Sequence, residues 1–255
     1  MKVLPSQVNL TEQVYDAIVA DIVDGKLMPG ERIIQEQIAD LLGVSRQPVQ
    51  QALLLLRNEG LLNDGPGRGL VVAPLNLARV RQTYEVRAVL EGLAFRKAAL
   101  INSDRARRLG PTLIDKGRDE TARGSVSGMI AADMTLHNFV YELADNPLIG
   151  PTLQAQWTYT QRVMGEVLLR DETPRNVWDE HERMMDAVIA ADGDKAERLA
   201  RDHIMDSADF MIGRLRNGHE TAVDSAIPLS ASNGAFSLPM GSTPWAATCV
   251  HRMKV

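Results

Sequence analysis

The 255-residue sequence has one cysteine, few aromatic residues and no long apolar run. A single cysteine, Cys249, excludes an intramolecular disulfide framework and is typical of a reducing compartment. No stretch approaches the roughly 18 apolar residues of a membrane-spanning helix, which excludes an integral membrane protein. Asp16, Asp21 and Asp24 lie where a secretory signal needs an apolar core, so we expect a cytoplasmic protein.

An excess of positive charge is also missing. The formal net charge is −5, and residues 1–75 carry six basic and nine acidic side chains. A protein that binds nucleic acid by charge alone is a broad polycation, and this chain is not one. Nucleic-acid binding must therefore depend on a local surface. The segment from Gly43 to Asn58, which holds Arg46 and Arg57 and no acidic residue, is the candidate.

The first 75 residues have the pattern of a winged helix–turn–helix. Apolar residues at helical spacing predict three helices, over 11–23, 35–42 and 45–60. Thr11 and Ser45 are the expected N-caps of the first and third helices, and Gly60 is the expected stop. Short apolar runs at 61–63 and 70–72 flank a loop rich in glycine and proline, which predicts a β-hairpin.

The pattern of residues 76–255 predicts a series of helices followed by a tail. Turn-forming residues separate six expected helices, over 80–101, 104–118, 126–144, 147–169, 175–191 and 194–215. The predicted fold is mainly α, a winged helix–turn–helix followed by an all-helical bundle of six or seven helices. We expect a DNA-binding domain over 1–75, a helical domain over 76–217, and a disordered tail, rich in Ser, Ala, Pro and Gly, over 218–255.

The start of the third expected helix is a candidate DNA-reading surface. In a helix–turn–helix, the second helix of the motif lies in the major groove with its N-terminal residues on base edges. These residues are Ser45, Arg46, Gln47, Gln50 and Gln51. Arginine reads guanine and glutamine reads adenine, each through two hydrogen bonds. The alternative is an ordinary surface helix with a polar first turn.

Four residues of the helical part have the chemistry of metal ligands. Asp133 and His137 are four residues apart on one expected helix and therefore point the same way. His181 and His203 lie on two consecutive expected helices. Three imidazoles and one carboxylate suit zinc first, with nickel or manganese as other candidates. The alternative is a surface Asp–His pair with two unrelated histidines.

A set of short motifs occurs in order through residues 8–75: Pro29-Gly30-Glu31-Arg32, Ile38-Ala39, Gly43-Val44-Ser45-Arg46, Pro48-Val49, Ala52-Leu53, Glu59-Gly60-Leu61 and Arg68-Gly69. With these motifs the segment resembles the DNA-binding domain of the GntR superfamily of bacterial regulators. The resemblance implies that Arg46 contacts DNA and that Arg68-Gly69 lies at the wing tip. This chain has Gln50-Gln51 where the family usually has Arg-Glu, so we expect its operator to differ from the family's commonest one.

Residues 80–217 resemble the FadR-type ligand-binding domain, called FCD, of the same superfamily. The matching pieces are Glu85-x-Arg87 with Glu91, Asp133-x-x-x-His137, Ala144 to Leu148, Glu180-His181, Ala187 with Asp192-Gly193-Asp194, Ala196 and His203. The resemblance implies that Asp133, His137, His181 and His203 bind a divalent metal. It also implies that Arg87 holds an effector carboxylate, although Arg87 can instead pair with Glu91 one helical turn later.

These features predict a dimeric cytoplasmic transcription factor, a repressor that binds a pseudo-palindromic operator on double-stranded DNA. Its effector is a small carboxylate metabolite bound between the metal and Arg87. A sugar acid, hydroxy acid or dicarboxylate is expected to fit better than an amine or a long acyl chain. The sign of regulation stays open. The alternatives are a metal-dependent enzyme and a regulator with a purely structural metal. We find no general base beside the metal motif, which counts against the enzyme.

Overall fold

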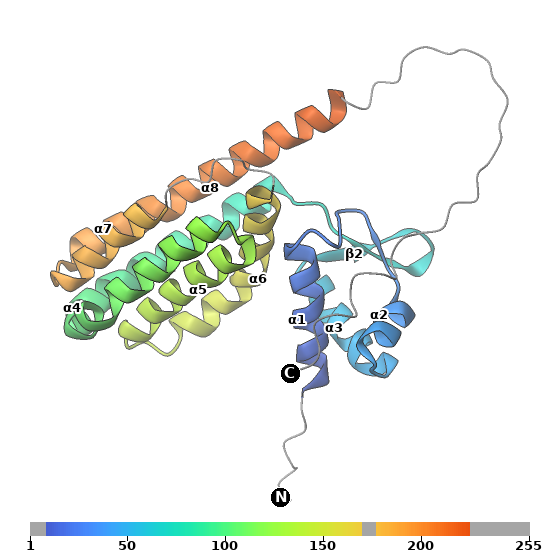
Figure 1. The fold of residues 1–255 in the computed structure, drawn as a ribbon, viewed down its shortest axis with the longest axis horizontal. Coiled ribbons are helices and arrows are strands. Elements are labelled where there is room, and N and C mark those ends of the chain that lie inside the picture. The colour runs from blue at the N-terminus through green and yellow to red at the C-terminus, as the bar shows by residue number, and fades with distance from the viewer. Residues whose placement is uncertain (1–8, 170–176, 225–255) are drawn as a thin grey trace, which may run out of the picture. The chain divides into compact units, whose positions relative to one another are not determined.

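The computed structural model describes residues 9–169 and 177–224 (Figure 1). The chain divides into two compact units, Met1–His219 and Glu220–Val255, and the first contains nearly all of the described residues. The described elements are mostly helices, with one small antiparallel sheet, so the predicted fold class is confirmed. In this described part, none of the helices combines the length and apolar character that a membrane span requires.

The N-terminal part is a winged helix–turn–helix. Its elements are α1 (Leu10–Val23), β1 (Arg32–Ile33), α2 (Gln35–Leu42), α3 (Arg46–Asn58), β2 (Leu62–Asp64), the 3-10 turn η1 (Pro66–Arg68) and β3 (Leu70–Val72). β3 pairs antiparallel with both other strands, in the order β1-β3-β2. The hairpin β2–β3 is confirmed. Strand β1 was not predicted, because two residues are too short to show a period.

The helix caps differ from the prediction. Asn9, and not Thr11, caps α1, since its side chain accepts a hydrogen bond from a backbone N–H of the first turn. The Thr11 hydroxyl instead donates to Gln51 Oε1 of α3 at 2.8 Å. Ser45 occupies the N-cap position of α3 as expected, but its side chain makes no capping hydrogen bond. The Ser45 hydroxyl therefore has no capping role in this structure.

Five helices form the helical part among the described residues. They are α4 (Leu77–Arg123), α5 (Val126–Leu143), α6 (Ile149–Leu168), α7 (Trp178–Ile189) and α8 (Gly193–Asp224). The sequence predicts two helices over 80–101 and 104–118, and α4 contains both, joined at a kink. Its backbone leaves helical geometry only at Asn102, with φ −132°, and the Asn102 side chain donates to the Leu143 carbonyl at 2.8 Å. Helix α8 passes the expected start of the tail at 218, and residues 225–255 lie outside the described ranges.

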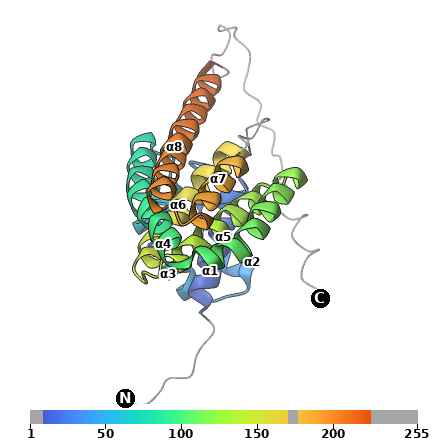
Figure 2. The same cartoon turned by 90° about the vertical axis from the view of Figure 1, so that its left-hand side faces the viewer.

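The helices of this part enclose two apolar clusters. α4 packs against α5, α6 and α7 (Figures 1 and 2). Ion pairs from Arg81 to Asp209 and from Arg96 to Asp194 join α4 to α8. The interior of these helices is apolar apart from a few charged and polar residues. The candidate site is formed by six of them: Arg87, Glu91, Asp133, His137, His181 and His203.

Helix α6 also contacts the winged helix. Met164 and Leu168 of α6 pack against the apolar core that α1 shares with α3. Arg162 of α6 is buried, and its guanidinium donates to the carbonyls of Leu61 and Ala73, at the two ends of the hairpin. The division between 1–75 and 76–217 stays a prediction, since these contacts cross it.

Candidate functional site

Three imidazoles from three helices converge inside the bundle. His137 of α5, His181 of α7 and His203 of α8 are 1%, 0% and 6% exposed. One ring nitrogen of each lies within 4.8 Å of the others. The Nε2 atoms of His181 and His203 are 3.2 Å apart. The structure therefore brings together histidines that are 66 residues apart at most in the sequence.

Asp133 adds a carboxylate to these imidazoles. Its Oδ1 lies 3.4 Å from His181 Nε2 and 3.9 Å from His137 Nε2. Because Asp133 and His137 are one turn apart on α5, they share a helix face, as predicted. Ligands held at about 2.0–2.2 Å from a zinc ion lie about 3–3.5 Å apart at neighbouring positions. The separations of 3.2 Å and 3.4 Å fall in this range, whereas the 3.9 Å separation and the 4.8 Å limit on the histidine nitrogens exceed it.

Two further carboxylates contact the imidazoles on the side away from this convergence. Glu180 Oε2 lies 2.8 Å from His203 Nδ1, and Glu91 Oε2 contacts His137 Nδ1. A carboxylate at one ring nitrogen fixes the tautomer and leaves the other nitrogen for a metal. His137 Nε2 is buried and has no hydrogen-bond partner among the described residues. A metal ion would satisfy that nitrogen, so the residues present fit a bound cation.

Burial and charge act in opposite directions within this cluster. Burial lowers the pKa of His203 below its usual value. Burial also acts to lower the pKa of His137, but attraction to the carboxylates of Glu91 and Asp133 outweighs it and raises that pKa. At Glu91 burial acts to raise the pKa, while positive charge on Arg87 and His137 lowers it to about 2. Glu91 is therefore ionised at neutral pH.

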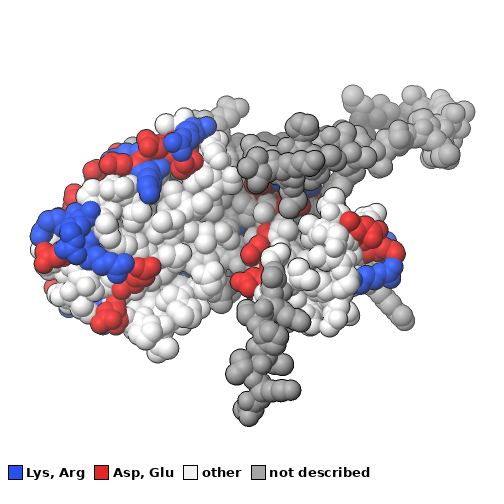
Figure 3. All heavy atoms as spheres, turned by 60° about the horizontal axis from the view of Figure 1, so that its bottom comes forward, with Lys and Arg blue, Asp and Glu red and all other residues white. Residues whose placement is uncertain are grey.

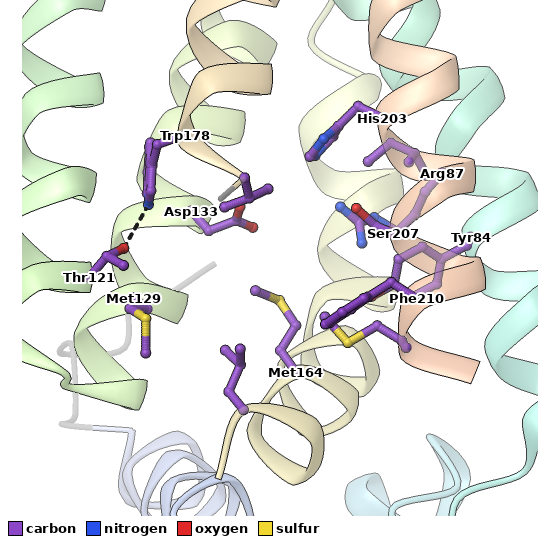
Figure 4. A pocket seen from close by; sticks show the side chains of 14 residues that line it. Tyr84, Arg87, Thr121, Met129, Asp133, Met164, Trp178, His203, Ser207 and Phe210 are labelled. Carbon is purple, nitrogen blue, oxygen red and sulfur yellow. Dashed lines mark hydrogen bonds between the residues drawn. The ribbon is translucent and has the colours of Figure 1, made fainter. Parts of the chain in front are cut away.

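Arg87 lies beside both this cluster and a cavity. Its Nε donates to Glu91 Oε1 at 2.8 Å, and both side chains are buried. Its guanidinium lies 4.5 Å from the centre of the Trp157 ring. The pairing with Glu91 that the sequence left open is thus present. Arg87 nevertheless lines the cavity together with Asp133 and His203 (Figure 4), so the pairing does not remove it from the cavity wall.

The expected DNA-reading residues lie on one exposed surface at the start of α3. Ser45, Arg46, Gln47, Gln50 and Gln51 are all exposed. Arg46 forms an ion pair with Glu36 of α2, although 67% of its side chain is exposed. Gln51 accepts the hydrogen bond from Thr11. Arg46 and Gln51 therefore have intramolecular partners that a base contact would replace.

The wing residue Arg68 and the surface charge do not add further detail to the DNA-reading surface. Arg68 belongs to η1 and precedes Gly69, but its side chain lies outside the described part. On the face drawn in Figure 3, basic and acidic side chains lie beside one another, with uncharged surface between the groups. This face thus has the mixed charge that the sequence predicts.

Sequence reasoning missed part of the cluster. Glu91 was expected only as a partner of Arg87, and its contact with His137 comes from a different helix. Glu180 was noticed only as part of a motif, and its contact with His203 also joins two helices. No spacing along one helix could have indicated either contact.

Comparison with known proteins gives matches to both parts of the chain. A family profile described as FCD domain matches residues 82–206, and one described as bacterial regulatory proteins, gntR family, matches residues 10–72. The HTH-type transcriptional repressor RspR of Escherichia coli K12 is 26% identical over 198 residues, which are 77% of this chain and 86% of that protein. An HTH-type regulator from the ttuE-ttuC' intergenic region of Agrobacterium vitis is 32% identical over 126 residues, 48% of this chain and 74% of that protein.

Two solved structures share the fold. Escherichia coli McbR/YncC has a TM-score of 0.70 at 19% identity, covering 82% of this chain and 99% of that one. A GntR regulator from Rhodococcus sp. RHA1 has a TM-score of 0.67 at 21% identity, covering 81% of this chain and 99% of that one. At these identities the likeness concerns the fold alone.

Proposed function

The chain belongs to the GntR family of bacterial regulatory proteins and carries an FCD domain, and from this premise we propose a repressor controlled by a small organic acid. Members of this family bind DNA through the helix–turn–helix, and FCD domains bind small-molecule effectors. The relatives are transcriptional regulators and not enzymes, so the comparison does not support the alternative that the chain is a metal-dependent enzyme. In the proposal, the acid binds beside a metal in the helical part and changes operator affinity.

One observation carries the proposal. Donor atoms of Asp133, His137, His181 and His203 converge, and the cavity beside them is also lined by Arg87. These four side chains would hold a divalent cation, zinc first, with nickel or manganese as alternatives. When bound, the ion supplies a positive centre that attracts an oxygen ligand. The Arg87 guanidinium adds a planar donor for a carboxylate within the same cavity.

Operator recognition is assigned to the exposed start of α3 and to the wing. In the proposal, Ser45 and the N-terminus of α3 hold a phosphate. Arg46, Gln47, Gln50 and Gln51 read base edges, and Arg68-Gly69 follows the adjacent groove. The segment 1–75 is the DNA-binding domain in this scheme and 76–217 the sensing domain. Such a regulator works in the compartment that holds the chromosome, so the cytoplasm stays our prediction.

We propose a homodimer, because one winged helix covers only one half of a symmetric operator. An apolar face on the first half of α4 supports this. Val86, Val89, Leu93 and Leu100 are exposed and recur at helical spacing on one side of the helix. A second copy of the chain would bury this face. Sedimentation of the protein should give twice the mass of one chain, and Leu93→Asp should shift it towards the monomer.

The metal assignment is tested first, on full-length protein purified without a polyhistidine tag. Elemental analysis should find up to one divalent metal per chain. The double variant His181→Ala, His203→Ala should lose that metal, while Glu197→Gln, a surface change on α8, should keep it. Unchanged metal content in the double variant refutes the assignment.

The regulatory part is tested on DNA. Selection from randomised duplexes should enrich a two-fold symmetric site, and an organic acid should change the affinity of metal-loaded protein for that site. Chelation should abolish the response, and so should the double variant Arg87→Met, Glu91→Leu, which leaves no unpaired buried charge. If no symmetric site is enriched, the proposed operator recognition is wrong.

A purely structural metal is the second candidate, because Arg87 already has a buried partner in Glu91. In that case the metal would hold three helices together and no effector would bind. Metal-loaded protein would then show the same operator affinity with and without every acid tested. That result would favour this candidate over an acid-controlled regulator.

A further inference from the structure

The cavity beside the four candidate metal ligands has two chemically different ends. His203, Arg87, Ser207 and Tyr84 lie on one side of the cavity, and Asp133 faces them from the other side (Figure 4). Met129, Met164 and Phe210 lie at the lower end of the same view, and Leu168, Val177 and Met211 add apolar wall. A ligand that fills the cavity would therefore meet charged and polar groups with one part and apolar side chains with the rest.

Two polar side chains in the wall already have partners. Trp178 Nε1 donates to Thr121 Oγ1 at 3.1 Å (Figure 4, dashed line). The Thr121 hydroxyl in turn donates to the Gly117 carbonyl at 3.0 Å. The indole N–H and the hydroxyl proton are thus both used within the protein. A polar group of a ligand would find no free donor at these two residues.

We propose that the effector is a monocarboxylic acid with a compact apolar body. This inference rests on the proposed function and narrows it. The carboxylate lies at the end lined by Arg87, Asp133 and His203, and the body lies among the methionines and Phe210. A sugar acid, hydroxy acid or dicarboxylate would place further polar groups against Met129, Met164 and Phe210, where they lose water without gaining a partner. The expectation from the sequence alone is therefore replaced by one based on the cavity wall.

The cavity also limits the size of the body. Its volume is about 70 Å³. An apolar cavity of about 150 Å³ accepts benzene. Three of the wall residues are methionines, Met129, Met164 and Met211, whose unbranched side chains adapt to the shape of a ligand. A short alkyl group is closest to this volume, a single aromatic ring fits only when the methionine side chains move outward, and a long acyl chain does not fit.

The test is a binding series on full-length, metal-loaded protein by calorimetry. Acetate is the probe for the carboxylate end alone. Butanoate, 4-methylpentanoate and benzoate add apolar bodies, and glycolate, succinate and gluconate add polar ones. Each buried methylene should raise the affinity about fourfold, the equivalent of ~0.8 kcal/mol. The three polar acids should bind no more tightly than acetate.

A variant locates the apolar body. Met129→Gln keeps the length of the side chain and adds an amide to the apolar end. It should lower the ratio of benzoate affinity to acetate affinity about tenfold. Met205→Gln, on α8 outside the cavity lining, is the matched control and should leave that ratio as in the wild type. Equal ratios in the Met129 variant and the wild type would contradict the placement of the body.

The outcomes separate this inference from the proposed function. If succinate or gluconate binds more tightly than benzoate, the apolar body is wrong, while an acid-binding sensor stands. If no acid in the series binds, acetate included, although elemental analysis finds the metal, the acid-controlled function itself fails. Tighter binding of the apolar acids that depends on Met129 supports the inference.

Discussion

Replacing Glu91 with glutamine perturbs the centre of the buried charge network. Glu91 is 0% exposed, and its oxygens contact Arg87 Nε at 2.8 Å and His137 Nδ1. Glutamine keeps the shape of the side chain but removes the negative charge, so the Arg87 guanidinium stays buried without compensation. Removing one partner of a buried ion pair costs about 3–5 kcal/mol. At about 2–4 °C per kcal/mol for a domain of this size, the midpoint of thermal unfolding should fall by about 6–20 °C.

The assay is thermal and urea unfolding of protein treated with a chelator, so that metal loss does not contribute. Glu197→Gln is the matched control, since Glu197 pairs with Arg201 at 2.8 Å and with Arg96 at 3.3 Å, and all three side chains are partly exposed. An exposed pair of that kind is worth about 0–1 kcal/mol. The double variant Arg87→Met, Glu91→Leu should recover most of the loss, because apolar residues can replace a buried pair. If Glu91→Gln unfolds within 1 kcal/mol of the control, Glu91 does not compensate Arg87 as argued.

Three other measurements test the site and the DNA-reading surface. Glu180→Gln should weaken metal binding about 10–100-fold with little change in the fold, because Glu180 orients His203, and a competition titration with a chromogenic chelator measures this. The folded pKa of Glu91, about 2, lies below its usual 4.5, so its ionisation stabilises the fold above pH 4.5. Urea midpoints of metal-free wild type should therefore fall as the pH drops from 4.5 towards 2, and less so for Glu91→Gln. Arg46→Ala should cost about 1–3 kcal/mol on the selected operator in a fluorescence anisotropy titration. An equal loss on every DNA sequence would make Arg46 a phosphate contact.

The fold could be predicted where the signal is local. The 3.6-residue period, with a glycine after the last turn, gives helix 35–42 the same bounds as α2. Asn102-Ser103 is likewise predicted as the break between two helices, and the backbone kinks at Asn102, whose side chain donates to the Leu143 carbonyl. The local signal fails at the end of α8. Asn217-Gly218 lowers helix propensity without ending α8, which continues to Asp224.

The candidate site divides in the same way. Asp133 and His137 follow from spacing on one helix, whereas the approach of His181 and His203 depended on family resemblance. The contacts of Glu91 and Glu180 with imidazoles join different helices, so the spacing of residues along one helix cannot predict them. The apolar end of the cavity was not predicted, because Met129 and Phe210 belong to the residue types that fill any core.

The contact of Arg162 with the hairpin has a consequence for how such proteins diversify. Arg162 donates to the main-chain carbonyls of Leu61 and Ala73, and every amino acid supplies a carbonyl at these positions. Substitutions in the side chains of the hairpin therefore leave these acceptors in place. The sequence of the hairpin can therefore change without loss of this contact. The apolar packing of Met164 and Leu168 against α1 and α3 depends on side chains, so it limits how far the helices of the winged helix can change with it.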